Sequence, residues 1–93
     1  MRISTILHSE HYHPLAIHAV PYVDGDMVRG CVLVDEEQGY AIVMERDDNG
    51  KIMMADARTP SMRIVWGRKV WIHWPEPWIK AEILRSQRAK GLA

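Results

Sequence analysis

Ninety-three residues make one small domain, and the hydrophobic (47%) and charged (26%) fractions are ordinary for a soluble globular protein. The single cysteine, Cys31, excludes an intramolecular disulfide, and no apolar run approaches the roughly 18 residues that a membrane-spanning helix requires. The first residues lack the long apolar segment of a secretion signal, so we expect no membrane association and a location in the reducing cytoplasm.

The first third of the chain predicts two strands separated by a polar loop. Arg2 to Leu7 favours a strand because β-branched residues dominate it. Pro14 discourages helix in the histidine-rich stretch before it, which we interpret as an irregular loop. Leu15 to Val20 is apolar at nearly every position and predicts a second strand, and Asp24-Gly25-Asp26 is a turn signal after it.

The middle third predicts an antiparallel meander. Three segments have the composition of strands: Met27 to Asp35, Tyr40 to Arg46 and Lys51 to Ala55. A polar turn ending in Gly39 separates the first two. Asn49-Gly50 separates the last two, and it is a strong hairpin signal because both residues tolerate the positive φ of a type I′ turn.

Two more strands are expected at Met62 to Trp66 and Lys69 to Trp74, with Gly67-Arg68 as the candidate turn between them. Side chains of the second strand alternate between two faces. One face is apolar and predicted to point inward; it holds Val70, Ile72 and Trp74. The other is predicted to be at least partly exposed; it holds Lys69, Trp71 and His73.

The chain is expected to end in a helix over about residues 77–90. Pro77 suits a first helical turn, Ile79 and Ile83 are spaced to face a sheet, and Gly91 is a natural stop. The predicted fold is therefore mainly β, in the α+β class. It is a single domain over 1–93, with a small antiparallel sheet or barrel-like meander of five to seven strands over about 2–74 and one C-terminal helix.

The zero net charge conceals a strong polarity along the chain. Residues 1–57 carry four basic and ten acidic side chains (net −6), whereas residues 58–93 carry eight basic and two acidic (net +6). All four tryptophans also lie in residues 58–93. Tryptophan mixed with Arg and Lys is typical of binding surfaces for protein or nucleic acid.

We expect a partner-binding face on the outward row of the last strand and the outer side of the helix. Its candidate residues are Arg68, Lys69, Trp71, His73, Arg85 and Arg88. The favoured function is non-catalytic binding to a protein or self-association, as in a small phage or mobile-element accessory protein. Binding of nucleic acid by the same residues is the alternative, although the neutral chain and its ten N-terminal acids weigh against a polyanion. A core filled by tryptophan, with solvated cations outside, is the third interpretation.

A second alternative is a metal site in the N-terminal loop. His8, His11 and His13 lie within six residues, and imidazole is a common ligand of zinc and nickel. Their spacing matches no known metal motif, so surface histidines in a polar loop are the favoured interpretation, and we predict no cofactor. A pH-sensitive contact is a further role that histidines there can serve.

Signs of catalysis are sparse. The chain contains no GxSxG, HExxH, CxxC or glycine-rich phosphate loop. Cys31 has apolar neighbours and no base nearby, so it is expected to be a buried structural residue. The acidic groups around Asp35 and Asp47 fall at predicted turns, where they are solvated or bond the turn itself. We therefore expect that the protein is not an enzyme.

Overall fold

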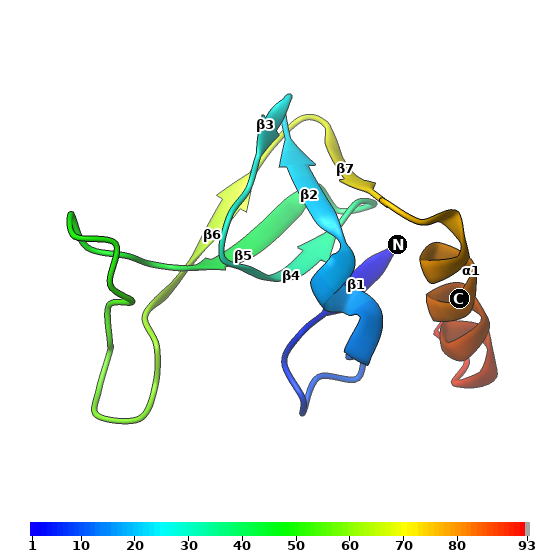
Figure 1. Ribbon diagram of the computed structural model, residues 1–93, viewed down its shortest axis with the longest axis horizontal. Helices are drawn as coiled ribbons and strands as arrows, with labels where there is room; N and C mark the ends of the chain where they lie inside the picture. The colour runs from blue at the N-terminus through cyan, green and yellow to red at the C-terminus, as the bar shows by residue number, and fades with distance from the viewer. Residues whose placement is uncertain (93) are drawn as a thin grey trace.

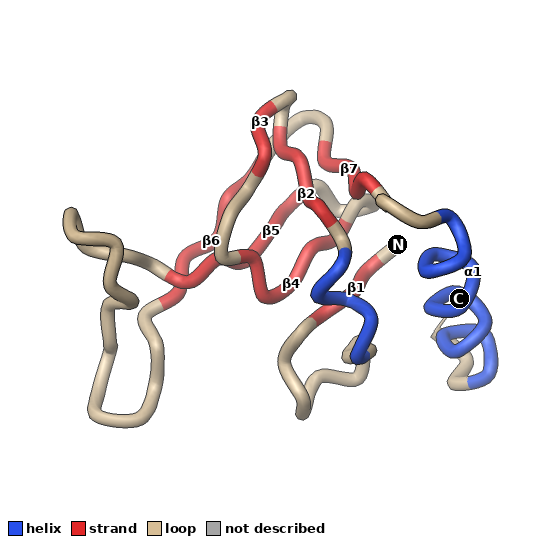
Figure 2. Tube along the Cα trace, in the orientation of Figure 1, coloured by secondary structure: helices blue, strands red, loops and turns tan. Residues whose placement is uncertain are grey.

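The computed structural model describes residues 1–92, in which two antiparallel sheets are combined with a short 3₁₀ helix and a terminal α-helix (Figures 1 and 2). The larger sheet has the order β1-β4-β5-β6 and the smaller one β3-β2-β7. The predicted class, an antiparallel β protein with one C-terminal helix, is confirmed. In chain order the elements are β1 (Arg2–Ser4), η1 (Pro14–His18), β2 (Val20–Val23), β3 (Asp26–Met27), β4 (Cys31–Asp35), β5 (Tyr40–Met44), β6 (Met62–Trp66), β7 (Val70–His73) and α1 (Pro77–Ala89).

The expected strand over Leu15 to Val20 is wrong. Pro14 to His18 form the 3₁₀ helix η1, and the second strand begins only at Val20. Pro14 occupies the first turn, where its missing N–H costs nothing, and Nδ1 of His13 accepts a hydrogen bond from the backbone N–H of Leu15 at 3.0 Å. A proline and a side-chain cap therefore override the apolar pattern.

The expected strand over Met27 to Asp35 is interrupted. Gly30 has a φ of 68°, which breaks the segment into β3 and β4. β3 belongs to the smaller sheet and β4 to the larger one, so the chain crosses between the sheets at this glycine. The β4–β5 turn forms as predicted, because Oδ1 of Asp35 accepts the backbone N–H groups of Glu37 and Gln38 at 3.0 and 2.9 Å.

The prediction of a third meander strand over Lys51 to Ala55 is also wrong, because no strand forms there. That segment makes only isolated bridges, and β6 pairs with β5 in its place. Side-chain carboxylates explain the difference: Asp47 accepts the backbone N–H groups of Asn49 and Lys51, and Asp56 does the same for the two residues before Pro60. These bonds close two tight loops, which extend from the β5–β6 ladder at the left of Figure 1.

β6 and β7 do not form a hairpin at Gly67-Arg68. β7 instead pairs with β2, from Val20↔His73 to Val23↔Val70. A Cβ built on Gly67 would overlap the Val23 side chain and lie 3.2 Å from both carboxylate oxygens of Asp24. The glycine thus allows β6 to end against β2 and the chain to turn into the other sheet.

The core lies between the two sheets and α1. Ile3, Val34 and Ala41 of the larger sheet meet Val23, Val70 and Ile72 of the smaller one, as the inward face of β7 predicted. Ile79 (4% exposed) and Ile83 (0% exposed) of α1 complete this core, which confirms their predicted spacing. Nε2 of Gln87 donates a 2.7 Å hydrogen bond to the backbone carbonyl of Arg2 and so ties α1 to β1. Neither helix in residues 1–92 has the length and apolar character needed to cross a bilayer.

Candidate protein-binding surface

The outer surface of the smaller sheet carries a stacked pair of aromatic rings. The chain neighbours of Tyr22 in β2 and of Trp71 in β7 are buried, so these two side chains point away from the core. The strand register places them directly opposite each other. Their ring centroids are 4.4 Å apart and the rings are within 7° of parallel, a cross-strand contact that holds both side chains in place.

Met27 and His73 extend this pair across and along the sheet. Met27 of β3 lies opposite Tyr22 on the other side and is 47% exposed. The ring of His73 is exposed and meets Trp71 edge-on, with centroids 6.4 Å apart. We call these four residues, Met27, Tyr22, Trp71 and His73, the outer row. The row is apolar and aromatic along its centre and ends in a side chain that can hydrogen-bond.

Charges of both signs surround one end of the outer row. The exposed residues Arg68 and Lys69 donate their backbone N–H groups to Oδ1 of Asp24, at 2.9 and 2.8 Å. Asp24 is itself exposed in the β2–β3 turn beside them. The structure therefore brings Arg68, Lys69, Trp71 and His73 together, but it adds the Asp24 carboxylate to the two cations.

The free edge of β7 is closed by a side chain. Oε2 of Glu36, in the β4–β5 turn, accepts the backbone N–H of Ile72 at 3.0 Å. A partner strand adding to this edge would have to displace that carboxylate. A partner would therefore contact the face of this sheet, through the side chains of the outer row, and would not pair with its backbone edge.

Arg85 and Arg88 lie apart from the outer row. Figure 1 shows α1 leading away from the end of β7, and these arginines are in its second half, roughly 12–16 Å along the axis from Pro77. Both are exposed, and the Arg85 guanidinium is engaged by Glu82 one turn earlier. That hydrogen-bonded pair lowers the pKa of Glu82 and raises that of Arg85.

The three N-terminal histidines lie in different local environments. His13 caps η1, His11 is half-buried, and His8 is exposed. Burial is the main cause that lowers the pKa of His13; Lys90 lowers it further, and Glu82 opposes the shift. Within residues 1–92, no group of three or more His, Cys, Asp or Glu side chains is placed to hold a metal ion.

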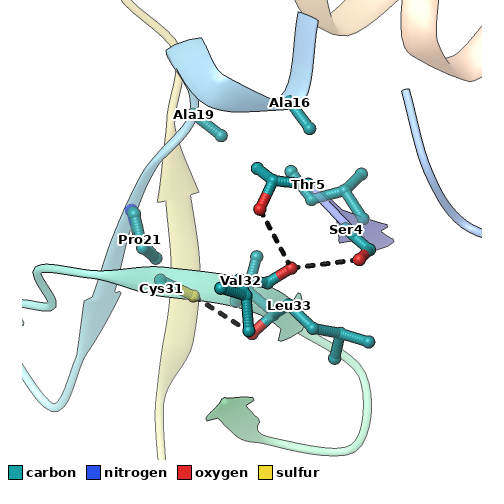
Figure 3. A pocket seen from close by; sticks show the side chains of 10 residues that line it. Ser4, Thr5, Ala16, Ala19, Pro21, Cys31, Val32 and Leu33 are labelled. Carbon is teal, nitrogen blue, oxygen red and sulfur yellow. Dashed lines mark hydrogen bonds between the residues drawn. The ribbon is translucent and has the colours of Figure 1, made fainter. Parts of the chain in front are cut away.

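Cys31 lines a hollow of about 20 Å³, room for roughly one water molecule, between η1 and β4 (Figure 3). Its Sγ donates a hydrogen bond to the backbone carbonyl of Leu33 at 3.0 Å. Burial raises the pKa of the thiol to about 11, so the sulfur is protonated and weakly nucleophilic near neutral pH.

A larger hollow of about 310 Å³ lies between the last turns of α1, β1 and the β4–β5 turn. Arg2 and Asp35 face each other at its wall, with 3.9 Å between Nε and Oδ2. Leu84 and Leu92 supply apolar lining. The wall combines both signs of charge and contains no Ser, Thr or Cys nucleophile.

A second exposed apolar row, along β6, was not predicted from the sequence. Met62, Ile64 and Trp66 alternate along β6 and are 40%, 51% and 64% exposed. Alternating large apolar residues in MRIVW were the available signal, since residues i, i+2 and i+4 of a strand share a face. Trp78, 58% exposed at the start of α1, was also overlooked.

Comparison with known proteins gives no relative: no family model, no curated protein and no solved structure matches this chain.

Proposed function

We propose that this chain is a non-catalytic protein-binding module that contacts its partner through the outer row. The observation that supports it best is the Tyr22–Trp71 stack, which presents two pre-ordered rings on the surface of a sheet. Aromatic side chains held in one conformation lose little entropy on binding, and tryptophan and tyrosine are enriched among residues that dominate interface energetics. An aromatic centre with a polar rim of mixed charge is the usual composition of a protein interface.

The distribution of charge favours a protein over a nucleic acid. Affinity for nucleic acid comes mostly from cations that neutralise phosphates. At the outer row, Arg68 and Lys69 are accompanied by the Asp24 carboxylate, and the cations of α1 lie along another element. Tyr22 also occupies one face of the Trp71 indole, so a base could stack on at most the other face.

We further propose that the protein works in the cytoplasm, as a small accessory factor that modulates a larger assembly. A lone thiol and a 93-residue chain suit that role.

A comparative capture experiment tests the binding proposal. Immobilised wild-type protein, Trp71→Ala and Trp78→Ala are exposed to an extract of cells that encode the chain, with and without nuclease. We expect a defined protein that wild type and Trp78→Ala retain, that Trp71→Ala loses, and that nuclease does not release. Trp78 is the control because it is another tryptophan, with its ring exposed on a different element, whereas Trp71 is half-buried in its stack.

Two outcomes would overturn the proposal. Retention of the same protein by Trp71→Ala would place the contact elsewhere on the chain. Release by nuclease, with retention that falls steeply as salt rises, would identify a nucleic-acid binder instead. Because truncating Trp71 can also disturb the fold, His73→Ala, at an exposed position of the same row, is carried in parallel and should weaken retention.

A further inference from the structure

β6 is the free edge of the larger sheet, and it lacks the devices that protect the other edges. The β1 edge is covered by residues 11–13, which exchange backbone hydrogen bonds with Ser4 at 3.0 and 3.3 Å. The β7 edge carries the Glu36 carboxylate, and β3 is only two residues long. In residues 1–92, β6 has five residues and pairs with β5 alone. Exposed apolar edge strands of this kind associate with other strands.

The backbone groups that β6 leaves free can be assigned from the ladder. At its two ends, Glu45 N–H donates to the carbonyl of Ser61, and Gly67 N–H donates to that of Gly39. Bonded and non-bonded pairs alternate in an antiparallel ladder, and the β5–β6 register is continuous between these bonds. Arg63 and Val65 are therefore bonded to β5, while the N–H and C=O groups of Met62, Ile64 and Trp66 point to the free edge.

We propose that a second copy of this chain pairs with β6, antiparallel, about a two-fold axis through Ile64. In this register each Ile64 would exchange both backbone hydrogen bonds with Ile64 of the second copy, and Met62 would do so with Trp66 of that copy. The three residues of β6 with free backbone groups are also the three with exposed apolar side chains. The register that pairs these backbone groups therefore also places the apolar side chains of the two copies opposite each other. The two four-stranded sheets become one of eight strands.

The charges agree with a second copy as the occupant. Arg63 is the one charged residue of β6, and the register places it opposite Val65 of the second copy and not opposite itself. Continuing the register brings Pro60 beside Arg68 of the second copy. No two like charges therefore face each other directly along the ladder from residue 60 to residue 68. This interface uses another sheet than the outer row, so the inference is independent of the proposed function.

Charge-swap variants at the axis test the proposal by sedimentation velocity over a concentration series. Wild type should approach twice the chain mass of 10.8 kDa as concentration rises. A residue on a two-fold axis faces itself, so Ile64→Lys alone and Ile64→Glu alone should remain monomeric by like-charge repulsion. An equimolar mixture of the two should recover the dimer.

Trp78→Lys is the control, because it places the same charge on an exposed apolar residue of α1 and should leave dimerisation unchanged. Position 64 is half exposed, so the folded state should tolerate either charge, and circular dichroism verifies this. A monomeric wild type at all concentrations, dimeric Ile64→Lys, or a mixture that stays monomeric would each overturn the proposal.

Discussion

His13 shows how one side chain links two parts of this small molecule, η1 and α1. Its Nδ1 accepts the N–H of Leu15 and so begins η1, and its ring is close enough to α1 for Glu82 and Lys90 to act on its titration. Because a nitrogen that accepts a hydrogen bond cannot carry a proton, the cap requires the neutral ring. Burial favours the same form and lowers the pKa of His13 below 6.5.

His13 is therefore expected to make stability fall with acidification. Between the lowered pKa of the folded state and the 6.5 of the unfolded chain, the unfolded state binds more protons, so the free energy of unfolding decreases as pH falls through that window. His13→Asn keeps a cap acceptor and removes the titration, so urea unfolding followed against pH should show a shallower decline below 6.5. His8→Asn, at an exposed position, should keep the wild-type slope; equal slopes for all three proteins would contradict this role of His13.

At Gly67, a neighbour distant in the sequence explains why a glycine is needed. Gly67→Ala should cost about 1–3 kcal/mol of stability, because the new methyl group meets Val23 and the Asp24 carboxylate. A double-mutant cycle by denaturant unfolding isolates this contact. In the Val23→Ala background, where the space is open, the Gly67→Ala cost should shrink; an unchanged cost would show that the clash is not its cause.

At the scale of elements, α1 is attached to the sheets by few contacts that are deeply buried. Ile83 has no exposed surface and sits in the core with Ile79. Ile83→Ala should therefore lower the free energy of unfolding by about 2–5 kcal/mol, through lost burial and the cavity that remains. Lys80→Ala, on the exposed side of the same helix, should leave the denaturation midpoint almost unchanged. Similar losses for both would mean that helix propensity, and not packing, holds α1.

The helix and the faces of β7 could be predicted because their signals are local. Three signals depend only on near neighbours: the spacing of Ile79 and Ile83, the alternation of Val70 and Ile72, and the helix stop at Gly91. The φ of Gly91 is 76°. The pairing of β6 could not be predicted. The turn signal at Gly67-Arg68 was genuine, yet a contact with Val23, 44 positions earlier, directs the chain into the other sheet.

The candidate site also has a part that local signals predicted and a part that depends on long-range pairing. Alternation along β7 predicted that Lys69, Trp71 and His73 share an outward face, whereas the Tyr22 partner of Trp71 depends on β2–β7 pairing and was missed. Arg85 and Arg88 were grouped with that face by charge alone, and the direction of α1 separates them from it.

At the scale of the whole molecule, the two sheets offer different surfaces. The smaller sheet presents the ordered outer row with a polar rim, whereas the larger sheet ends in the open, apolar edge of β6. A dimer formed through β6 would carry two outer rows and could bind a repetitive partner with increased avidity.

Trp71 and its stacked neighbour Tyr22 are proposed to form the contact surface for a protein partner. Isothermal titration of the captured partner against wild type, Trp71→Ala and Trp78→Ala, each verified as folded, tests it most directly. Trp71→Ala should raise Kd at least about tenfold, the loss of about 1.4 kcal/mol that marks a dominant interface residue, and Trp78→Ala should change it by less than about twofold. Equal affinities for Trp71→Ala and wild type would contradict the account.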